Sequence, residues 1–134
     1  MKDLMSKLSG TMPGEMISAL EKVYKELEEK QERFQCSFSV SCKKGCGECC
    51  EHYVPFLTQA EALLAAYIVL KEDKEFEVLS LLNKGDPNSS VCPLYKREGE
   101  YHCSLYEGRS MVCRLFGFSV SMDKEDHMVW RACK

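Results

Sequence analysis

Four cysteines occupy nine consecutive positions in the first half of the chain. Cys42, Cys46, Cys49 and Cys50 lie in the stretch CKKGCGECC. Two thiolates three residues apart in a tight turn can bind one ion, and Gly47 allows the turn from Cys46 to Cys49 to bend with its amides towards the sulfurs. The spacing therefore predicts one half of a metal site.

Three later cysteines are the candidates for the other half. Cys92, Cys103 and Cys113 follow one another at intervals of 11 and 10 residues in the last third of the chain. A metal bound by both groups would tie the cysteine-rich loop to this last third, so we expect the site to be part of the fold. Cys36 and Cys133 lie outside both groups and are expected to be ordinary residues.

The number of cysteines exceeds the needs of one tetrahedral ion. Adjacent side chains such as those of Cys49 and Cys50 point apart in most backbone conformations, so this pair suits a larger cluster or a second ion better than a single ion. The surplus thiols are candidates for a second ion, a redox pair or core packing. Thiolates bind both zinc and iron, so the predicted cofactor is zinc or iron, the latter including a [4Fe-4S] cluster.

Cationic side chains flank the cysteines. Four thiolates around Zn²⁺ or a [4Fe-4S]²⁺ core sum to a charge of about −2, which nearby cations and amide donors should offset. Lys43 and Lys44 lie inside the cysteine-rich stretch, and Arg109 and Arg114 lie on either side of Cys113. Each of the four is expected either to take this part or to be a solvated surface charge. The three histidines, His52, His102 and His127, show no ligand spacing and are expected at or near the surface.

Length and composition limit the class of protein. The chain has 134 residues and nine cysteines, and we expect one globular domain over residues 1–134. No basic segment leads into an apolar one at the start, so a cytoplasmic location is predicted, where structural disulfides are rare. The longest apolar run, 62–70, is about half the roughly 20 residues that cross a bilayer, so no membrane span is expected. A net charge of −3 argues against nucleic acid as a partner.

Hydrophobic periodicity predicts a helical scaffold. Residues 1–13 are expected to be a flexible leader, 15–34 an amphipathic helix, and 36–118 the cysteine-cluster core. A second helix should begin after Thr58, because Glu61 completes a capping box. A third helix over 73–83 should bury Phe76, Leu79 and Leu82 and end at Gly85.

The last third of the chain favours short strands. Residues 91–95 and 100–105 are expected to form a hairpin, 107–116 a short helix, and 118–122 with 127–131 a second hairpin. The predicted fold class is a small α-rich (α+β) domain of three to four helices and short β-hairpins, with cysteine-bearing loops closed around a metal site.

The ordered cysteines and their neighbours resemble a known family. Besides the first cluster, the segments CPLY at Cys92 and CSLYEGRSMVCRLFGF from Cys103 are similar to the CxxCxxCC family of cysteine-cluster proteins, described as a zinc- or iron-chelating domain. The resemblance covers residues 42 to about 118 and departs from the family in the three-residue gap after Cys42 and in Ser110 and Gly117, where proline is usual. It implies seven metal-binding positions, namely Cys42, Cys46, Cys49, Cys50, Cys92, Cys103 and Cys113. It also implies Tyr106, Arg109 and Arg114 as accompanying positions.

These observations lead to one main hypothesis and two alternatives. The main hypothesis is a metal-binding protein that holds zinc or an iron-sulfur cluster, equally compatible with a structural or storage role and with a catalytic or electron-transfer role. The first alternative is a thiol-disulfide oxidoreductase that uses Cys46 and Cys49, although the thioredoxin-like βαβ pattern is missing. The second alternative is a protein-interaction module that uses the N-terminal helix and is held together by the metal.

Overall fold

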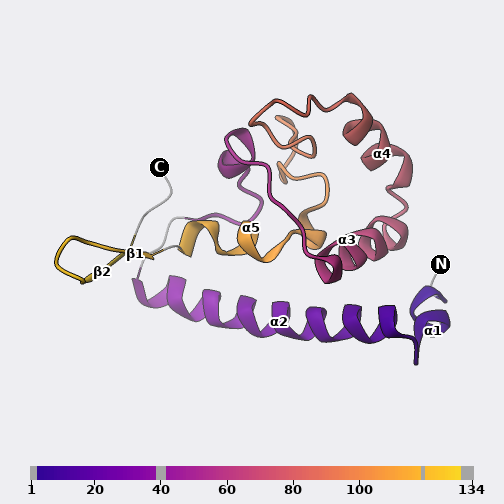
Figure 1. Cartoon of the computed structure of the whole chain (residues 1–134), viewed down its shortest axis with the longest axis horizontal. Helices are drawn as coiled ribbons and strands as arrows, with labels where there is room; N and C mark the ends of the chain where they lie inside the picture. The colour runs from indigo at the N-terminus through magenta and orange to yellow at the C-terminus, as the bar shows by residue number, and fades with distance from the viewer. Residues whose placement is uncertain (1–2, 39–41, 119, 131–134) are drawn as a thin grey trace.

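A long helix supports the rest of the molecule on one side. The computed structural model describes residues 3–38, 42–118 and 120–130. Helix α2 (Met12–Phe38) runs the length of the molecule, and the remaining helices and loops lie along one of its sides, as Figure 1 shows. The described residues form five α-helices and one two-stranded antiparallel sheet, which confirms the predicted α-rich class.

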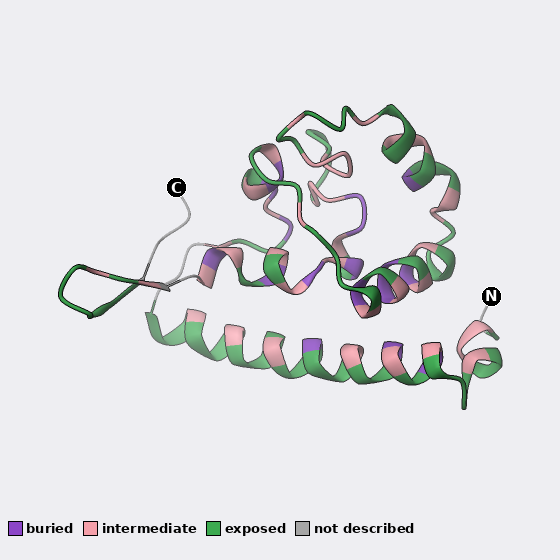
Figure 2. Ribbon diagram, in the orientation of Figure 1, coloured by how far each residue is buried: buried purple, intermediate pink, exposed green. Residues whose placement is uncertain are grey.

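Helix α2 presents one face to the body. Its buried residues are Gly14, Ile17 and Tyr24, and the buried and half-buried positions face the other helices in Figure 2. The helix is longer than the predicted 15–34. Pro13 is compatible with a first turn because the amides there lack helical partners anyway, and the Thr11 hydroxyl accepts a hydrogen bond from the Gly14 amide at 3.2 Å.

The structure differs from the prediction in the first residues of the chain. Residues expected to belong to a leader form the short helix α1 (Leu4–Leu8), and Met5 and Leu8 pack against the core. Gly14 permits this arrangement, because a Cβ at that position would lie 2.1 Å from the carbonyl oxygen of Leu8. The apolar side chains of this segment are therefore used for packing.

Helix α3 (Gln59–Lys71) provides the centre of the core. The predicted capping box is present, with the Thr58 hydroxyl accepting from the Glu61 amide. The core is made of side chains from α2, α3 and the segment before η2 (Tyr106–Gly108), namely Ile17, Tyr24, Leu64, Ala65, Ile68 and Leu105. Each large apolar side chain buried there contributes about 1.5–3 kcal/mol.

Helix α4 (Glu75–Lys84) ends at Gly85 as predicted but buries a different face. Its buried residue is Val78, whereas Phe76, Leu79 and Leu82 are 90%, 58% and 49% exposed, so the prediction that these three residues are buried was wrong. Residues spaced by three share one face of a helix, and here the face carrying Val78 is turned towards the body. An apolar stripe is left at the surface.

The last third of the chain is more irregular than predicted. The first expected hairpin is reduced to a single antiparallel bridge between Tyr95 and Cys103. The expected helix over 107–116 is divided into η2, α5 (Met111–Leu115) and η3 (Phe116–Phe118). The division occurs because Arg109 is extended and Ser110 caps α5, its hydroxyl accepting from the Cys113 amide at 3.4 Å.

The second predicted hairpin is formed. Strands β1 (Val120–Met122) and β2 (Met128–Trp130) pair with Ser121 opposite Val129 and project from the body at one end (Figure 1). Two residues of the predicted hairpin, Ser119 and Arg131, lie outside the described residues, as does Cys133. Among the described helices, none has the length and apolar character needed to cross a membrane.

Candidate metal centre

Cysteines far apart in the sequence meet around one cavity. The cavity has a volume of about 170 Å³, and its lining includes Cys46, Cys49, Cys50, Cys92, Cys103 and Cys113. The two groups of cysteines predicted to form two halves of a site are thus brought together. Cys50 is buried and the other five are half-buried.

The seventh predicted cysteine lies on an adjoining cavity. Cys42 lines a second cavity of about 160 Å³, which shares Cys46, Cys49 and Cys113 with the first. The Gln35 side chain of α2 donates to the carbonyl oxygen of Cys42 at 2.8 Å. Cys36 is exposed at the end of α2 and lines neither cavity.

Short loops rather than regular elements carry the first cysteines. Cys49 and Cys50 lie in the single 3₁₀ turn η1 (Glu48–Glu51), and both line the first cavity, although adjacent side chains were expected to point apart. Gly45 has φ +83°, a backbone conformation that favours glycine. Gly47 is needed for packing, since a Cβ there would lie 2.4 Å from Cβ of His102.

Backbone hydrogen bonds join this loop to the last third of the chain. The Cys92 amide donates to the Cys50 carbonyl at 2.8 Å, and the His102 amide donates to the Gly45 carbonyl at 3.0 Å. The Tyr95 hydroxyl also donates to the Glu51 carboxylate. The cysteine-rich loop is therefore fixed against the segment that carries Cys92 and Cys103 by the chain's own hydrogen bonds.

Glu61 positions the segment that carries Cys113. Its Oε1 accepts from the Met111 amide at 2.7 Å and from the Tyr24 hydroxyl at 3.2 Å, while its Oε2 accepts from the Thr58 amide and hydroxyl, both at 2.8 Å. Burial would raise the pKa of Glu61, but these hydrogen bonds lower it overall. A buried carboxylate thus holds α2, α3 and the start of α5 together.

The two arginines have different surroundings. Arg114 is buried. Its Nη1 donates to the Glu28 carboxylate at 2.8 Å and its Nη2 donates to the Glu107 carbonyl at 2.7 Å, and its guanidinium lies 4.0 Å from the ring centroid of Tyr24. Arg114 therefore supports the fold, and it also lines the second cavity together with Cys42 and Cys113. Arg109 lines both cysteine cavities.

The lysines of the cysteine-rich stretch remain at the surface. Lys43 and Lys44 are exposed and line the second cavity, not the first. Of the four predicted cations, Arg109 is the one that lies at the cavity shared by most of the cysteines.

The thiols differ in acidity. A hydrogen bond from Cys50 lowers the pKa of Cys49 to about 6, with the Arg109 charge contributing, and the same hydrogen bond and burial raise the pKa of Cys50. Burial raises the pKa of Cys92, Cys103 and Cys113. Near neutral pH, Cys49 is therefore mainly a thiolate, whereas Cys50, Cys92, Cys103 and Cys113 are protonated.

The sulfurs around the first cavity do not form a compact group of three or four. Four thiolates at about 2.3 Å from one zinc ion lie about 3.8 Å from one another in a tetrahedron. Among the described residues, one group of three or more His, Cys, Asp or Glu brings its ligand atoms within 4.8 Å of one another, and it contains no cysteine. Nowhere in the described chain do three cysteine sulfurs meet that limit.

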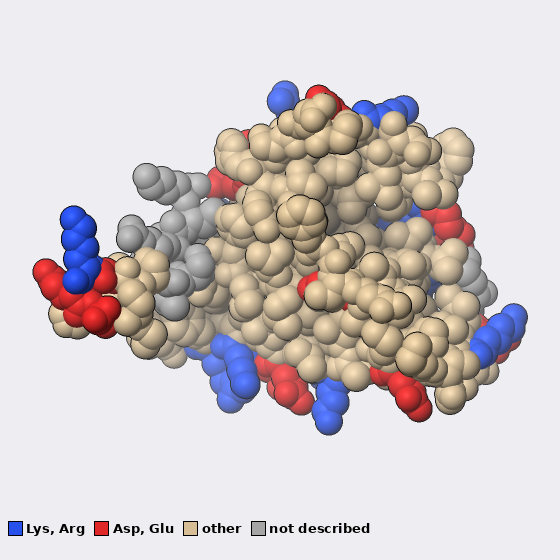
Figure 3. All heavy atoms as spheres, in the orientation of Figure 1, with Lys and Arg blue, Asp and Glu red and all other residues tan. Residues whose placement is uncertain are grey.

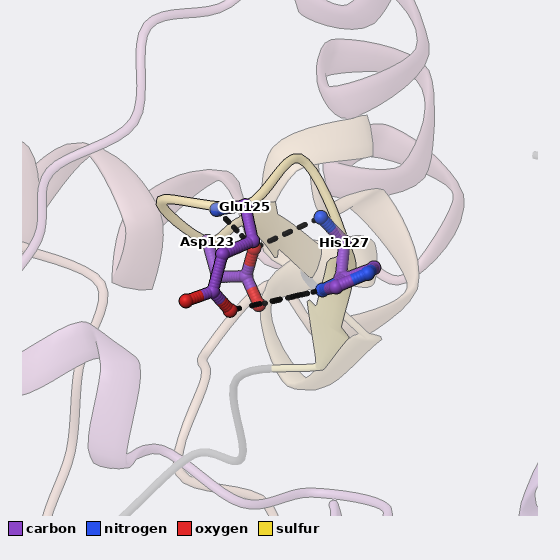
Figure 4. A group of neighbouring side chains, drawn as sticks. All are labelled: Asp123, Glu125 and His127. Carbon is purple, nitrogen blue, oxygen red and sulfur yellow. Dashed lines mark hydrogen bonds and ion pairs between the residues drawn. The ribbon is translucent and has the colours of Figure 1, made fainter.

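That compact group lies at the tip of the β1–β2 hairpin. It consists of Asp123, Glu125 and His127 (Figure 4). The Asp123 carboxylate accepts from the amides of Glu125 and His127 at 2.8 and 2.9 Å, so its role in the turn is accounted for. Glu125 and His127 are exposed, and we interpret the three residues as part of the hairpin turn rather than as a metal site.

Sequence reasoning missed the apolar walls of the first cavity. The residues between η1 and α3 that line it are Tyr53, Val54, Pro55 and Leu57, and Leu82 of α4 lines it as well. The available signal was the run of apolar residues directly after the cysteine-rich stretch, which belongs to neither a helical nor a strand pattern.

Comparisons with known proteins agree with the cysteine pattern. Residues 41–134 match the family CxxCxxCC, described as "Putative zinc- or iron-chelating domain". Comparison with curated proteins and with solved structures gave no match. The match covers more than half of the chain and all seven of the clustered cysteines, and the family's description supports chelation of zinc or iron. The chain belongs to the CxxCxxCC family.

Proposed function

We propose that this protein holds an iron-sulfur cluster in the cavity lined by six of its cysteines. The observation that carries the proposal is the meeting of six cysteines around one cavity, with no three of their sulfurs within 4.8 Å of one another in the described chain. The candidate ligands are Cys46, Cys49, Cys50, Cys92, Cys103 and Cys113, with Cys42 as a further candidate from the adjoining cavity.

The spread of the sulfurs favours iron-sulfur over zinc. Each zinc ion needs up to four thiolates directly around it, whether it is alone or shares bridging thiolates with a second zinc. In an iron-sulfur cluster, inorganic sulfide fills most positions around each iron, and cysteines attach from outside. Protein sulfurs that surround a cavity at larger separations suit the second arrangement.

The environment of the cavity fits an anionic metal-thiolate group. Arg109 lies at both cavities and its charge acts on Cys49, Cys103 and Cys113. Apolar side chains also line the cavity, and both the charge and the apolar lining set the reduction potential of such a group.

An accessible face suits a redox or catalytic centre better than a structural one. Structural sites are closed, whereas catalytic sites keep one position open. Some of the residues that line the cavity are exposed at the surface, including Leu57 and Leu82. We infer that the protein works in the cytoplasm, because a reducing compartment keeps clustered thiols available for a metal.

The proposal is tested on cysteine variants purified without oxygen. We expect Cys103→Ser and Cys113→Ser to lose most bound iron and acid-labile sulfide. Cys36→Ser, which changes an exposed cysteine outside both cavities, should keep wild-type amounts. Wild-type iron and sulfide in Cys103→Ser and Cys113→Ser would contradict the proposed ligand set.

A thiol-disulfide oxidoreductase is the second candidate, because the pKa of Cys49 is lowered to about 6 and its partner in the Cys-x-x-Cys turn lines the same cavity. The same variants separate the two candidates. Disulfide reductase activity that depends on Cys46 and Cys49 and survives in Cys103→Ser and Cys113→Ser would favour the oxidoreductase.

The third hypothesis, an interaction module on the N-terminal helix, is less favoured. Leu20 of α2 packs against the core, so part of the apolar face that such a module would offer to a partner is already used within the chain.

A further inference from the structure

A second cavity adjoins the one assigned to the cluster. Its volume is about 160 Å³, and it is lined by residues of α2, of the cysteine-rich loop and of the 106–118 segment. Cys46, Cys49, Arg109 and Cys113 line both cavities. A ligand in the second cavity would therefore lie beside the cysteines proposed to hold the cluster, in a volume of its own.

Two glutamines of α2 join the walls of this second cavity. The Gln31 side chain donates to the carbonyl oxygen of Arg114 at 2.7 Å, and the Gln35 side chain donates to the carbonyl oxygen of Cys42 at 2.8 Å. The two glutamines are half-buried and lie four residues apart, on one face of the helix. Hydrogen bonds thus hold together the three segments that bound the cavity.

The second cavity differs from the first in the charges of its lining. Among the described residues that line the first cavity, Arg109 is the one with a charged side chain. The second cavity is lined by four cations and two carboxylates, namely Lys43, Lys44, Arg109, Arg114, Glu28 and Glu32. Its lining therefore has an excess of positive charge, which attracts anions.

Three of these cations are available to a ligand. Arg114 is already paired within the chain, whereas Lys43, Lys44 and Arg109 form no ion pair with any described residue. Nε of Arg109 donates to the Tyr106 carbonyl, and no described residue accepts a hydrogen bond from its two Nη atoms. A guanidinium held in this way can bind a carboxylate through two parallel hydrogen bonds.

Charge and volume together define the ligand. An uncharged apolar molecule would displace water from these cations without replacing its hydrogen bonds, which costs free energy. A cavity of about 150 Å³ can hold a benzene molecule. The volume of about 160 Å³ is therefore suited to an anion with a carbon skeleton of about that size.

We propose that the second cavity binds a small organic anion through its carboxylate group, with Arg109 as the main anchor and Lys43 and Lys44 as supporting charges. The anion site itself is built from the residues of the second cavity, and its place beside a metal centre rests on the proposed function. Because Arg109 lines both cavities, the bound anion lies where a substrate of that centre would lie.

The probe is 4-fluorobenzoate, added at low salt to the metal-loaded full-length protein prepared without oxygen and followed through its fluorine resonance. Low salt is used because ions screen the attraction between exposed charges. We expect saturable binding at a single site and no saturable binding of 4-fluorobenzamide, which has the same ring without the charge. Equal affinity for the two compounds, or no saturable binding of 4-fluorobenzoate, would overturn the proposal.

Lysines inside and outside the cavity offer matched variants. Lys43→Gln/Lys44→Gln removes two lining cations, and Lys22→Gln/Lys30→Gln removes two exposed cations of α2 that line neither cavity. Figure 3 shows Lys and Arg alternating with Asp and Glu along the lower edge of the molecule, where α2 lies in Figure 1, so charges there offset one another. The first variant should weaken 4-fluorobenzoate binding about tenfold, and the second should leave it unchanged. Equal effects would overturn the assignment of the site.

Glu32 tests the sign of the interaction. This exposed carboxylate lines the second cavity and forms no ion pair with a described residue, so it repels a bound anion. Glu32→Gln should strengthen 4-fluorobenzoate binding about threefold at low salt. Unchanged or weaker binding would contradict an anion in this cavity.

Metal analysis of the same samples separates this inference from the proposed function. Protein that carries stoichiometric iron and sulfide but does not bind 4-fluorobenzoate would overturn the anion site alone. Selective binding by protein without iron and sulfide would support the anion site and overturn the proposed cluster. The substituted side chains, Lys43, Lys44 and Glu32, are exposed, so the variants should keep wild-type metal content.

Discussion

The guanidinium of Arg109 lies 3.6 Å from the ring centroid of Tyr106 and donates from Nε to the carbonyl oxygen of the same residue at 2.9 Å. Tyr106 in turn packs edge-on against Tyr101, with 4.8 Å between ring centroids. Two aromatic rings and a backbone oxygen thus hold one positive charge at the cysteine cavities. A cation fixed by stacking and hydrogen bonding loses little further freedom when it interacts with thiolates.

Removing this charge should weaken metal retention. We expect Arg109→Gln to lose iron to a chelator roughly 10- to 100-fold faster than the wild type, the range seen when groups that support metal ligands are changed. Arg109→Lys should give an intermediate rate, because it keeps the charge but loses the planar stacking. Arg33→Gln, on the exposed side of α2, is the control and should match the wild type. Equal rates for Arg109→Gln and Arg33→Gln would contradict the role of Arg109.

Glu61 should make stability depend on pH in the acid range. Its folded pKa lies below its ordinary value of 4.5, so its ionised form stabilises the folded chain above that pH, and this contribution is lost as the pH falls. Glu61→Gln should lower the free energy of unfolding by about 1–3 kcal/mol at neutral pH, because buried partners lose a charged acceptor.

Urea denaturation of both proteins between neutral pH and pH 3 checks this. The difference between wild type and Glu61→Gln should shrink below about pH 4.5. The exposed Glu29→Gln is the control and should leave the denaturation midpoint unchanged at every pH. A difference in the free energy of unfolding that stays constant with pH would mean that Glu61 stabilises the protein through packing rather than through its charge.

The thiol of Cys49 should be the most reactive of the cavity cysteines in metal-free protein. The hydrogen bond from Cys50 lowers its pKa to about 6, so most of it is thiolate at neutral pH, whereas burial raises the pKa of Cys92, Cys103 and Cys113. Peptide mapping after brief alkylation should show a pH midpoint near 6 for Cys49. Cys50→Ala should move that midpoint upwards, and an unchanged midpoint would refute the hydrogen bond as its cause.

Gly47 should be essential for assembling the two halves of the site. A methyl group there would meet Cβ of His102 at 2.4 Å and the Tyr95 ring at 3.0 Å. Gly47→Ala should therefore destabilise the protein by about 1–3 kcal/mol, as overpacking generally does, and reduce bound iron. Lys44→Ala, an exposed side chain in the same loop, should change neither quantity. Wild-type iron content and stability in Gly47→Ala would show that the loop docks differently.

The elements with a clear local cause were predictable. The capping box of Thr58 and Glu61 fixes the start of α3 through bonds between near neighbours, and the apolar stripe of α2 identifies its inner face. The convergence of Cys46, Cys49, Cys92, Cys103 and Cys113 could be expected because clustered thiols need a common partner.

The elements that depend on tertiary packing were not predictable. Phe76, Leu79 and Leu82 form a good apolar stripe, but the stripe does not say whether the core or a cavity mouth lies beside it. Likewise, Arg109 and Arg114 are equivalent in the sequence, and only the positions of Tyr24, Glu28 and Tyr106 decide which one lines the cavity with six cysteines.

The proposed iron-sulfur cluster in the cysteine cavity is tested most directly by the iron, acid-labile sulfide and zinc content of wild-type protein purified without oxygen, together with its visible absorption spectrum. We expect iron and sulfide in equal amounts, more than one iron per chain, and broad visible absorption that disappears on exposure to a chelator and oxygen. A colourless protein with one zinc per chain and no sulfide would contradict it.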